Sequence, residues 1–170
     1  MSQGKKSSNP AGVPLDALLA QWRRERPDLD PAPMAVCGAV WRAYERLRQG
    51  LLANISPAGL DRPGFDVLLT LRRQGKGRAL SPSGLAKEIM LSTSAMTNRL
   101  DRLEKKGLIE RRSDPGDRRG LRIVLTEEGF ALADRLVASH VAAQEAMLGA
   151  LDEEERATLR RLLEKIADRP

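Results

Sequence analysis

The sequence is poor in aromatic residues, cysteine and histidine. Aromatic side chains make up 3% of its 170 residues, and there is one cysteine and one histidine. A single cysteine cannot form an intramolecular disulfide, which is typical of a reducing compartment. No run approaches the roughly 20 apolar residues that a membrane helix needs, and no apolar segment of a secretory signal follows the basic N-terminus. We therefore expect a cytoplasmic protein that contacts no membrane.

Motifs for catalysis and for metal or cofactor binding are also absent from the sequence. It contains no spaced metal ligands, no glycine-rich phosphate loop and no motif for an activated nucleophile. We therefore predict that the protein is not an enzyme and that it binds neither a metal nor a cofactor.

Positive charge is concentrated in the middle of the chain. The net charge is +6, but residues 72–122 contain 14 basic and 6 acidic side chains, whereas residues 123–170 contain 6 basic and 10 acidic ones. A uniformly solvated surface would not separate charge in this way, whereas a segment that faces phosphates would. The middle segment is therefore the candidate for contact with nucleic acid.

The same segment has the pattern of a winged helix-turn-helix. Two short helical patterns, 81–90 and 92–106, begin at serines that can act as N-caps. Two strand-like runs follow, 108–113 and 121–125, on either side of the hairpin tip DPGDRRG. A short strand at 78–80 is placed to join this hairpin. One helix of this motif can enter a major groove while the hairpin reaches the phosphates or the minor groove.

Helical patterns with one apolar face flank this segment. We divide the chain into a disordered tail (1–14), N-terminal helices (15–60), the winged helix-turn-helix (61–126) and C-terminal helices (127–170). The expected fold class is mostly α with a small β-wing. Because the terminal helices have more apolar surface than one small winged helix can cover, we expect them to pack against a second copy of the chain.

One face of the second helix of the motif is suited to DNA. If Met96, Leu100 and Leu103 point inward, the other face presents hydroxyl, amide and guanidinium groups, which bind base edges and phosphates. Arginines at the hairpin tip are suited to a minor groove or the DNA backbone. The predicted DNA-binding residues are Thr93, Ser94, Thr97, Asn98, Arg99, Arg102, Arg118 and Arg119. A symmetric dimer would present two such helices to successive major grooves of a palindromic site in double-stranded DNA.

The hairpin tip and its flanks resemble a known family. Residues 114–119 read DPGDRR, between the segments RLEKKGLIERR and VLTEEG. This pattern resembles the MarR family of bacterial regulators, whose wing typically contains a D-x-x-D-R-R signature. The resemblance extends from about Met34 to Ile166. It implies a homodimeric transcriptional regulator, a repressor of its own gene and a neighbouring one, with N- and C-terminal helices in the dimer interface.

An extra N-terminal helix with the sequence QWRRERPDLD resembles the PecS-like, urate-responsive subgroup of this family. The subgroup pairs the Trp with an Asp and an Arg ahead of the helix-turn-helix and an Arg just after the recognition helix. The resemblance therefore assigns ligand binding to Trp22, Asp66, Arg73 and Arg111. An indole can stack on a flat ring and two arginines can hold an anion. We expect a small anionic ligand, with urate as the first choice and citrate or aconitate as alternatives.

Two other interpretations are open. Cys37 could act as a redox-sensing thiol near the dimer interface, although we expect its helix to bury it as a small core residue. We expect the one histidine, His140, to be structural or exposed. A winged helix can also serve purely as a protein-interaction adaptor. The adaptor predicts that replacing Arg99, Arg118 and Arg119 with alanine leaves function intact, whereas DNA binding predicts weaker binding that depends less on salt.

Overall fold

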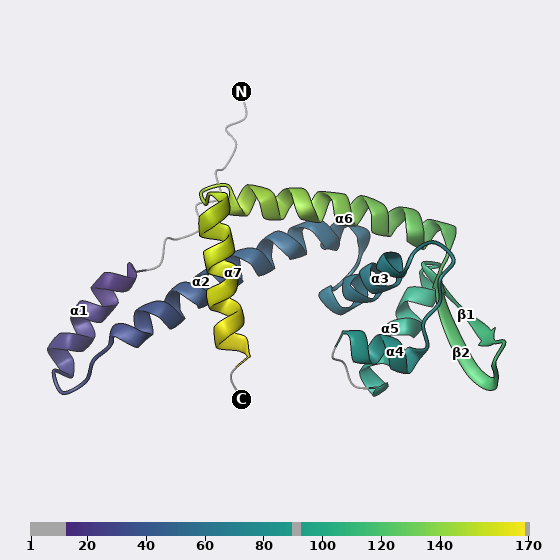
Figure 1. Cartoon of the computed structure of the whole chain (residues 1–170), viewed down its shortest axis with the longest axis horizontal. Coiled ribbons are helices and arrows are strands. Elements are labelled where there is room, and N and C mark those ends of the chain that lie inside the picture. The colour runs from purple at the N-terminus through teal and green to yellow at the C-terminus, as the bar shows by residue number, and fades with distance from the viewer. Residues whose placement is uncertain (1–12, 90–92, 169–170) are drawn as a thin grey trace, which may run out of the picture. The chain divides into compact units, whose positions relative to one another are not determined.

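The computed structural model describes residues 13–89 and 93–168, so most of the predicted tail at 1–14 lies outside the described residues. For four residues the description is limited to the backbone: Thr93, Ser94, Arg118 and Arg119. The elements follow in the order α1 (Leu15–Glu25), α2 (Ala32–Ile55), η1 (Ser56–Ala58), α3 (Arg62–Gln74), α4 (Pro82–Glu88), α5 (Thr93–Lys105), β1 (Ile109–Asp114), β2 (Asp117–Leu125), α6 (Glu127–Leu148) and α7 (Glu153–Ala167). Helices predominate, and the strands form a two-stranded antiparallel hairpin (Figure 1). The predicted fold class, mostly α with a small β-wing, is confirmed.

The chain divides into two units, Met1–Arg48 and Gln49–Pro170, with the boundary inside α2. In the first unit α1 packs against the first half of α2. A Cβ added at Gly38 would come within 2.7 Å of the Leu15 side chain, so the absence of a side chain there lets the two helices approach. The Arg42 guanidinium also donates a hydrogen bond to a backbone carbonyl just ahead of α1. No helix in the described part of the chain combines the length and hydropathy needed to cross a bilayer.

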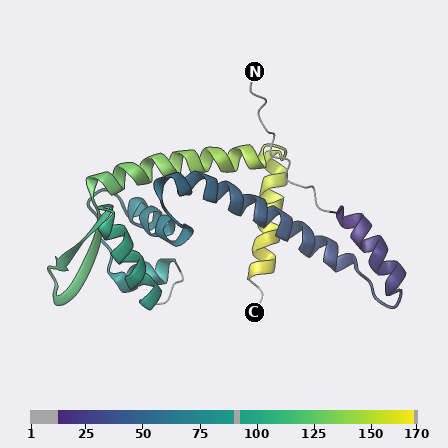
Figure 2. The same cartoon turned by 180° about the vertical axis from the view of Figure 1, so that it is seen from behind.

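The core of the second unit lies between α3, α4, α5, α6 and the hairpin. Both views show α3, α4 and α5 gathered near the start of α6, with the hairpin beside α5 (Figures 1 and 2). The predicted inward stripe of α5 is confirmed, because Met96, Leu100 and Leu103 are at most 2% exposed. Other large side chains of this core, each at most 2% exposed, are Ile55, Phe65, Leu68, Leu71, Leu85, Ile109 and Ile123.

Hydroxyl caps fix where α4 and α6 begin. The Ser81 hydroxyl accepts a hydrogen bond of 3.0 Å from the backbone N–H three residues later, and the Thr126 hydroxyl accepts one of 2.9 Å in the same way. Each hydroxyl satisfies a backbone donor that has no partner within its own helix. The predicted cap at Ser92 and the predicted helix end at Met90 lie outside the described residues.

The wing is longer and its turn tighter than predicted. The strands pair from Ile109 with Leu125 to Asp114 with Asp117, with a shift in register before the last pair. The backbones of residues 117–120 therefore belong to β2, and the predicted seven-residue tip is reduced to a two-residue turn. The predicted short strand at 78–80 contributes one bridge between Leu80 and β2.

The Asp114 carboxylate explains the tight turn. It accepts a hydrogen bond of 3.0 Å from the Gly116 N–H and one of 2.7 Å from the Arg122 guanidinium across the hairpin. These two interactions, with the backbone donor first, hold the pKa of Asp114 below its ordinary value. The first Asp of the D-x-x-D-R-R signature thus shapes the wing tip.

Candidate nucleic-acid interface and ligand-binding residues

The recognition helix α5 presents polar side chains opposite its buried stripe. Thr97 and Asn98 are exposed, and the Arg102 side chain is 70% exposed. Packing of the apolar stripe fixes the rotation of the helix, so these three residues face outward. The predicted first-turn contacts, Thr93 and Ser94, begin the same helix and are described by their backbone alone. An exposed polar face of this kind is suited to a major groove.

Arg99 differs from the other predicted DNA contacts because only 18% of its side chain is exposed. Its guanidinium forms an ion pair with Asp61, the residue that caps the start of α3. Arg99 therefore joins the recognition helix to α3. Asp61 was not among the predicted site residues, although the pattern Asp61-Arg-Pro-Gly is an N-cap signal in the sequence.

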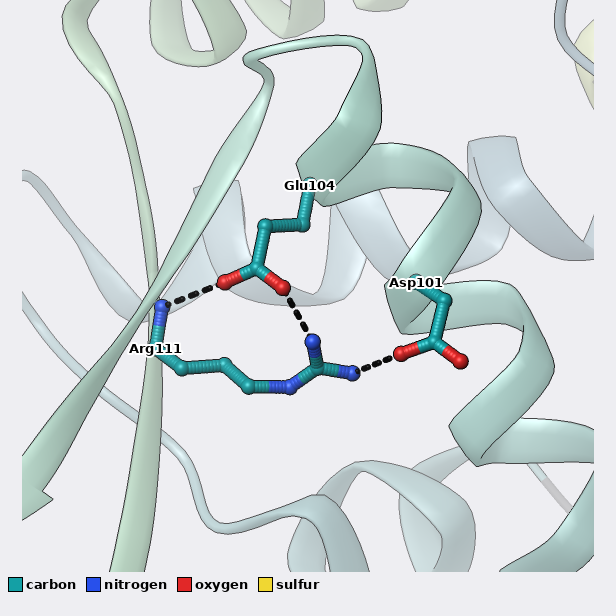
Figure 3. Close-up of polar contacts among 3 residues, drawn as sticks. All are labelled: Asp101, Glu104 and Arg111. Atoms are coloured by element: carbon teal, nitrogen blue, oxygen red, sulfur yellow. Dashed lines mark hydrogen bonds and ion pairs between the residues drawn. The ribbon is translucent and has the colours of Figure 1, made fainter.

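Arg111 joins the wing to the recognition helix. It lies on β1 with 23% of its side chain exposed, and it pairs with two carboxylates of α5, Asp101 at 2.6 Å and Glu104 (Figure 3). The Arg111 backbone N–H also donates to Glu104 at 3.3 Å. Removing this one guanidinium would release Asp101 and leave Glu104, among the described residues, with only the backbone N–H of Arg111. Sequence reasoning missed Asp101 and Glu104, because pairing across a helix–strand turn has no periodic signal.

The other predicted ligand residues have separate partners. Asp66 lies 3.8 Å from the Arg62 guanidinium, and Arg73 forms an ion pair with Glu88 of α4. Among the described residues, no hydrogen bond or ion pair joins Asp66, Arg73 and Arg111 to one another. Trp22 belongs to the first unit, where it is 46% exposed and hence accessible for stacking. The four-residue ligand site therefore stays a prediction.

Asp66 is a carboxylate in a partly buried position on α3. Burial raises its pKa above the ordinary value, and the nearby Arg62 and His140 act in the opposite direction. Burial likewise lowers the pKa of His140, whose ring packs edge-on against Phe65 with 5.2 Å between ring centroids. This packing agrees with the structural role expected for His140.

We expect Asp66→Asn to stabilise the protein, and more so as the pH rises. A carboxyl whose folded pKa is raised stabilises the fold fully below its unfolded pKa of about 3.9 and loses that contribution as the pH rises through the folded pKa. Asparagine carries no charge at any pH, so it avoids the cost of a charged carboxylate in this partly buried position. Urea denaturation of the wild type and the variant between pH 4 and pH 7 measures the difference in their free energies of unfolding. A difference that stayed constant or shrank with pH would contradict the assignment.

Cys37 is exposed, so the expectation that its helix buries it is wrong. Its neighbour Val36 is 59% exposed. The apolar run around Cys37 therefore forms a surface of the single chain instead of its core.

Two sequence similarities bear on these residues. A family profile described as "MarR family" matches residues 60–121. The transcriptional regulator PecS of Dickeya dadantii (strain 3937) is 43% identical over 149 residues, which cover 88% of this chain and 90% of that protein. The matched residues include α3, α4, α5 and much of the wing.

Two solved structures resemble the chain in fold and sequence. BpsR of Bordetella bronchiseptica, a protein whose DNA binding is regulated by 6-hydroxynicotinic acid, has a TM-score of 0.67 at 29% identity and covers 79% of this chain and 94% of its own. A mutant of MarR from E. coli complexed with operator DNA has a TM-score of 0.69 at 27% identity and covers 81% and 97%. Both likenesses extend well beyond the winged helix.

Proposed function

The chain belongs to the MarR family of transcriptional regulators, and we propose that it is a homodimeric repressor whose binding to a palindromic operator is modulated by a small anionic ligand. The observation that supports this most is the exposed polar face of α5, rotated outward by the buried stripe beneath it. Relatives in the family are transcriptional regulators, so the chain is a regulator and not an enzyme.

The proposed operator contacts serve two purposes: some read the base sequence, and others position the protein on the DNA backbone. Thr97, Asn98 and Arg102 lie outward on α5 for base edges and phosphates, with Thr93 and Ser94 in its first turn. Arg118 and Arg119 lie in the first part of β2, at the far end of the hairpin from α6, where long cations can reach the minor groove or the backbone. We propose a cytoplasmic location, where the operator is accessible.

A second copy of the chain is proposed to cover the apolar faces that the single chain leaves exposed. Helix α7 has no buried residue, and Trp41 on α2 is 73% exposed. Large exposed apolar patches are typical of protein interfaces. The remaining residues of these faces are Met34, Val36, Val40, Tyr44 and Leu47 on α2, and Leu159, Leu162, Leu163 and Ile166 on α7.

The proposed ligand is a small, flat anion such as urate, with citrate or aconitate as alternatives. Trp22 would stack on the ring, while Arg73 and Arg111 would hold the negative charge. The 43% identity to PecS and the response of BpsR to an aromatic acid support this class of ligand.

Arg111 offers a physical route from the ligand to the DNA. Its guanidinium holds Asp101 and Glu104 of the recognition helix, so an anion bound to Arg111 competes with both carboxylates. An anion beside Asp66 would in addition repel that carboxylate, which already lies in an unfavourable, partly buried position. Both effects would alter the position of α5 and thereby its affinity for the operator.

Titration of operator DNA in the presence of urate, and separately of citrate, tests this proposal. We expect urate to weaken the complex and Trp22→Ala or Arg73→Ala to abolish this response. Arg135→Ala, which removes an exposed arginine on α6, is the matched control and should leave the response unchanged. A reducing agent keeps the exposed Cys37 from contributing through oxidation.

Each outcome of that titration has a separate meaning. A response to citrate alone would retain the site and change its ligand. A response that persists in Trp22→Ala and Arg73→Ala would contradict the predicted site. DNA binding that is lost when the exposed Cys37 is oxidised, with no response to urate or citrate in the reduced protein, would favour the thiol-sensing alternative.

A further inference from the structure

A pocket lies between the recognition helix and the turn that leads into α3. Its volume is about 220 Å³. Gly59 and Asp61 of the turn line one side, and Arg99, Arg102 and Lys106 line the other. None of these five residues belongs to the predicted ligand site.

The pocket has more positive than negative charge. Three cationic side chains face one carboxylate, that of Asp61. One carboxylate oxygen of Asp61 accepts the Gly64 N–H at 3.0 Å and so caps α3, while the other pairs with Arg99 and lies 4.0 Å from Arg102. A single carboxylate that is already bound in these ways leaves a net positive charge in the pocket.

Two of the cationic side chains have an N–H group for which the described residues provide no hydrogen-bond or ion-pair partner. The Arg99 Nε is buried without a hydrogen-bond partner. Lys106 forms no ion pair with the residues that the structure describes, and its ammonium lies against the turn, where a Cβ added at Gly59 would come within 2.8 Å of it. A buried donor without an acceptor is costly, and this cost applies to the Arg99 Nε. A shift of the Arg99 side chain toward an anion in the pocket would remove it.

We propose that this pocket binds a phosphate-class oxyanion through Arg102, Lys106 and Arg99. Guanidinium and ammonium groups form strong, charge-assisted hydrogen bonds with such an anion, and the start of α3 adds the favourable end of a helix dipole. The oxyanion comes either from the DNA backbone or from a free phosphate. In either case the anion competes with Asp61 for Arg99. Binding in the pocket would therefore weaken the Asp61–Arg99 ion pair that joins α3 to the recognition helix.

Two neighbouring lysines provide a matched test. Lys106 lines the pocket and Lys105 does not, yet both are exposed and lie side by side in the sequence. The melting temperature of wild type, Lys106→Gln and Lys105→Gln is measured in inorganic phosphate and in chloride at equal ionic strength. The salt dependence of binding to duplex DNA is then measured for the same three proteins.

If the pocket takes free phosphate, phosphate raises the melting temperature of wild type and of Lys105→Gln but not of Lys106→Gln. If the pocket takes a DNA phosphate, inorganic phosphate leaves the melting temperature unchanged. Lys106→Gln, but not Lys105→Gln, then makes the slope of log DNA affinity against log salt concentration shallower by about one for each chain. Any other outcome, including identical behaviour of the two variants, overturns the proposal. Because the first arm contains no DNA, its result is independent of the proposed repressor function.

Discussion

Replacing Arg118 and Arg119 together with alanine is expected to weaken operator binding by about 100- to 1,000-fold at physiological salt. In a dimer the double substitution removes four cations from the two wings. Each lost phosphate contact lowers the slope of log affinity against log salt by about 0.9, so the slope becomes shallower by three to four. The measurement is fluorescence anisotropy with labelled operator DNA at several salt concentrations.

The control for this experiment is the double substitution of Arg160 and Arg161 on α7. It makes the same change in net charge at exposed positions far from the wing in sequence. We expect it to change DNA affinity little. If the two double variants lost the same affinity, net charge would explain the effect and the wing would have no specific role. If neither affected function, the adaptor interpretation would gain support.

Gly129→Ala is expected to lower the free energy of unfolding by about 3 kcal/mol and the melting temperature by roughly 10 °C. The added Cβ would lie 1.8 Å from the carbonyl oxygen of Leu108 and 2.7 Å from its carbonyl carbon. These are backbone atoms, so no side chain can rotate away to make room. The same carbonyl accepts the Thr126 N–H at 3.2 Å, so a shift of either segment would also disturb the start of α6.

Gly149→Ala is the matched control for this close approach. Gly149 has φ −62°, an ordinary helical value, and the nearest atom to an added Cβ is 3.5 Å away. We expect this variant to be as stable as the wild type or slightly more so. Thermal unfolding of both variants provides the comparison, and equal destabilisation would contradict the packing argument.

Local sequence signals predicted much of the second unit. Ser81 marked a helix start because a hydroxyl at the N-cap satisfies backbone donors in any context. The helical spacing of Met96, Leu100 and Leu103 predicted which face of α5 is buried, and with it which face is free for DNA.

The features that sequence patterns did not predict depend on other parts of the chain. Apolar spacing around Cys37 does not distinguish the core of one chain from a face that a second copy would cover, so its burial was wrongly expected. Arg111 was predicted to hold a ligand, but its partners Asp101 and Glu104 depend on how β1 returns beside α5. The short turn of the wing likewise depends on Arg122, which reaches Asp114 from the opposite strand.

The most direct test of the central claim is binding of the purified protein to the DNA upstream of its own gene, compared with shuffled DNA of the same composition. We expect much tighter binding to the upstream DNA, at a stoichiometry of one dimer per palindrome and with an affinity that falls steeply with salt. Equal binding to both DNAs, or no binding even at low salt, would contradict the account of a sequence-specific repressor.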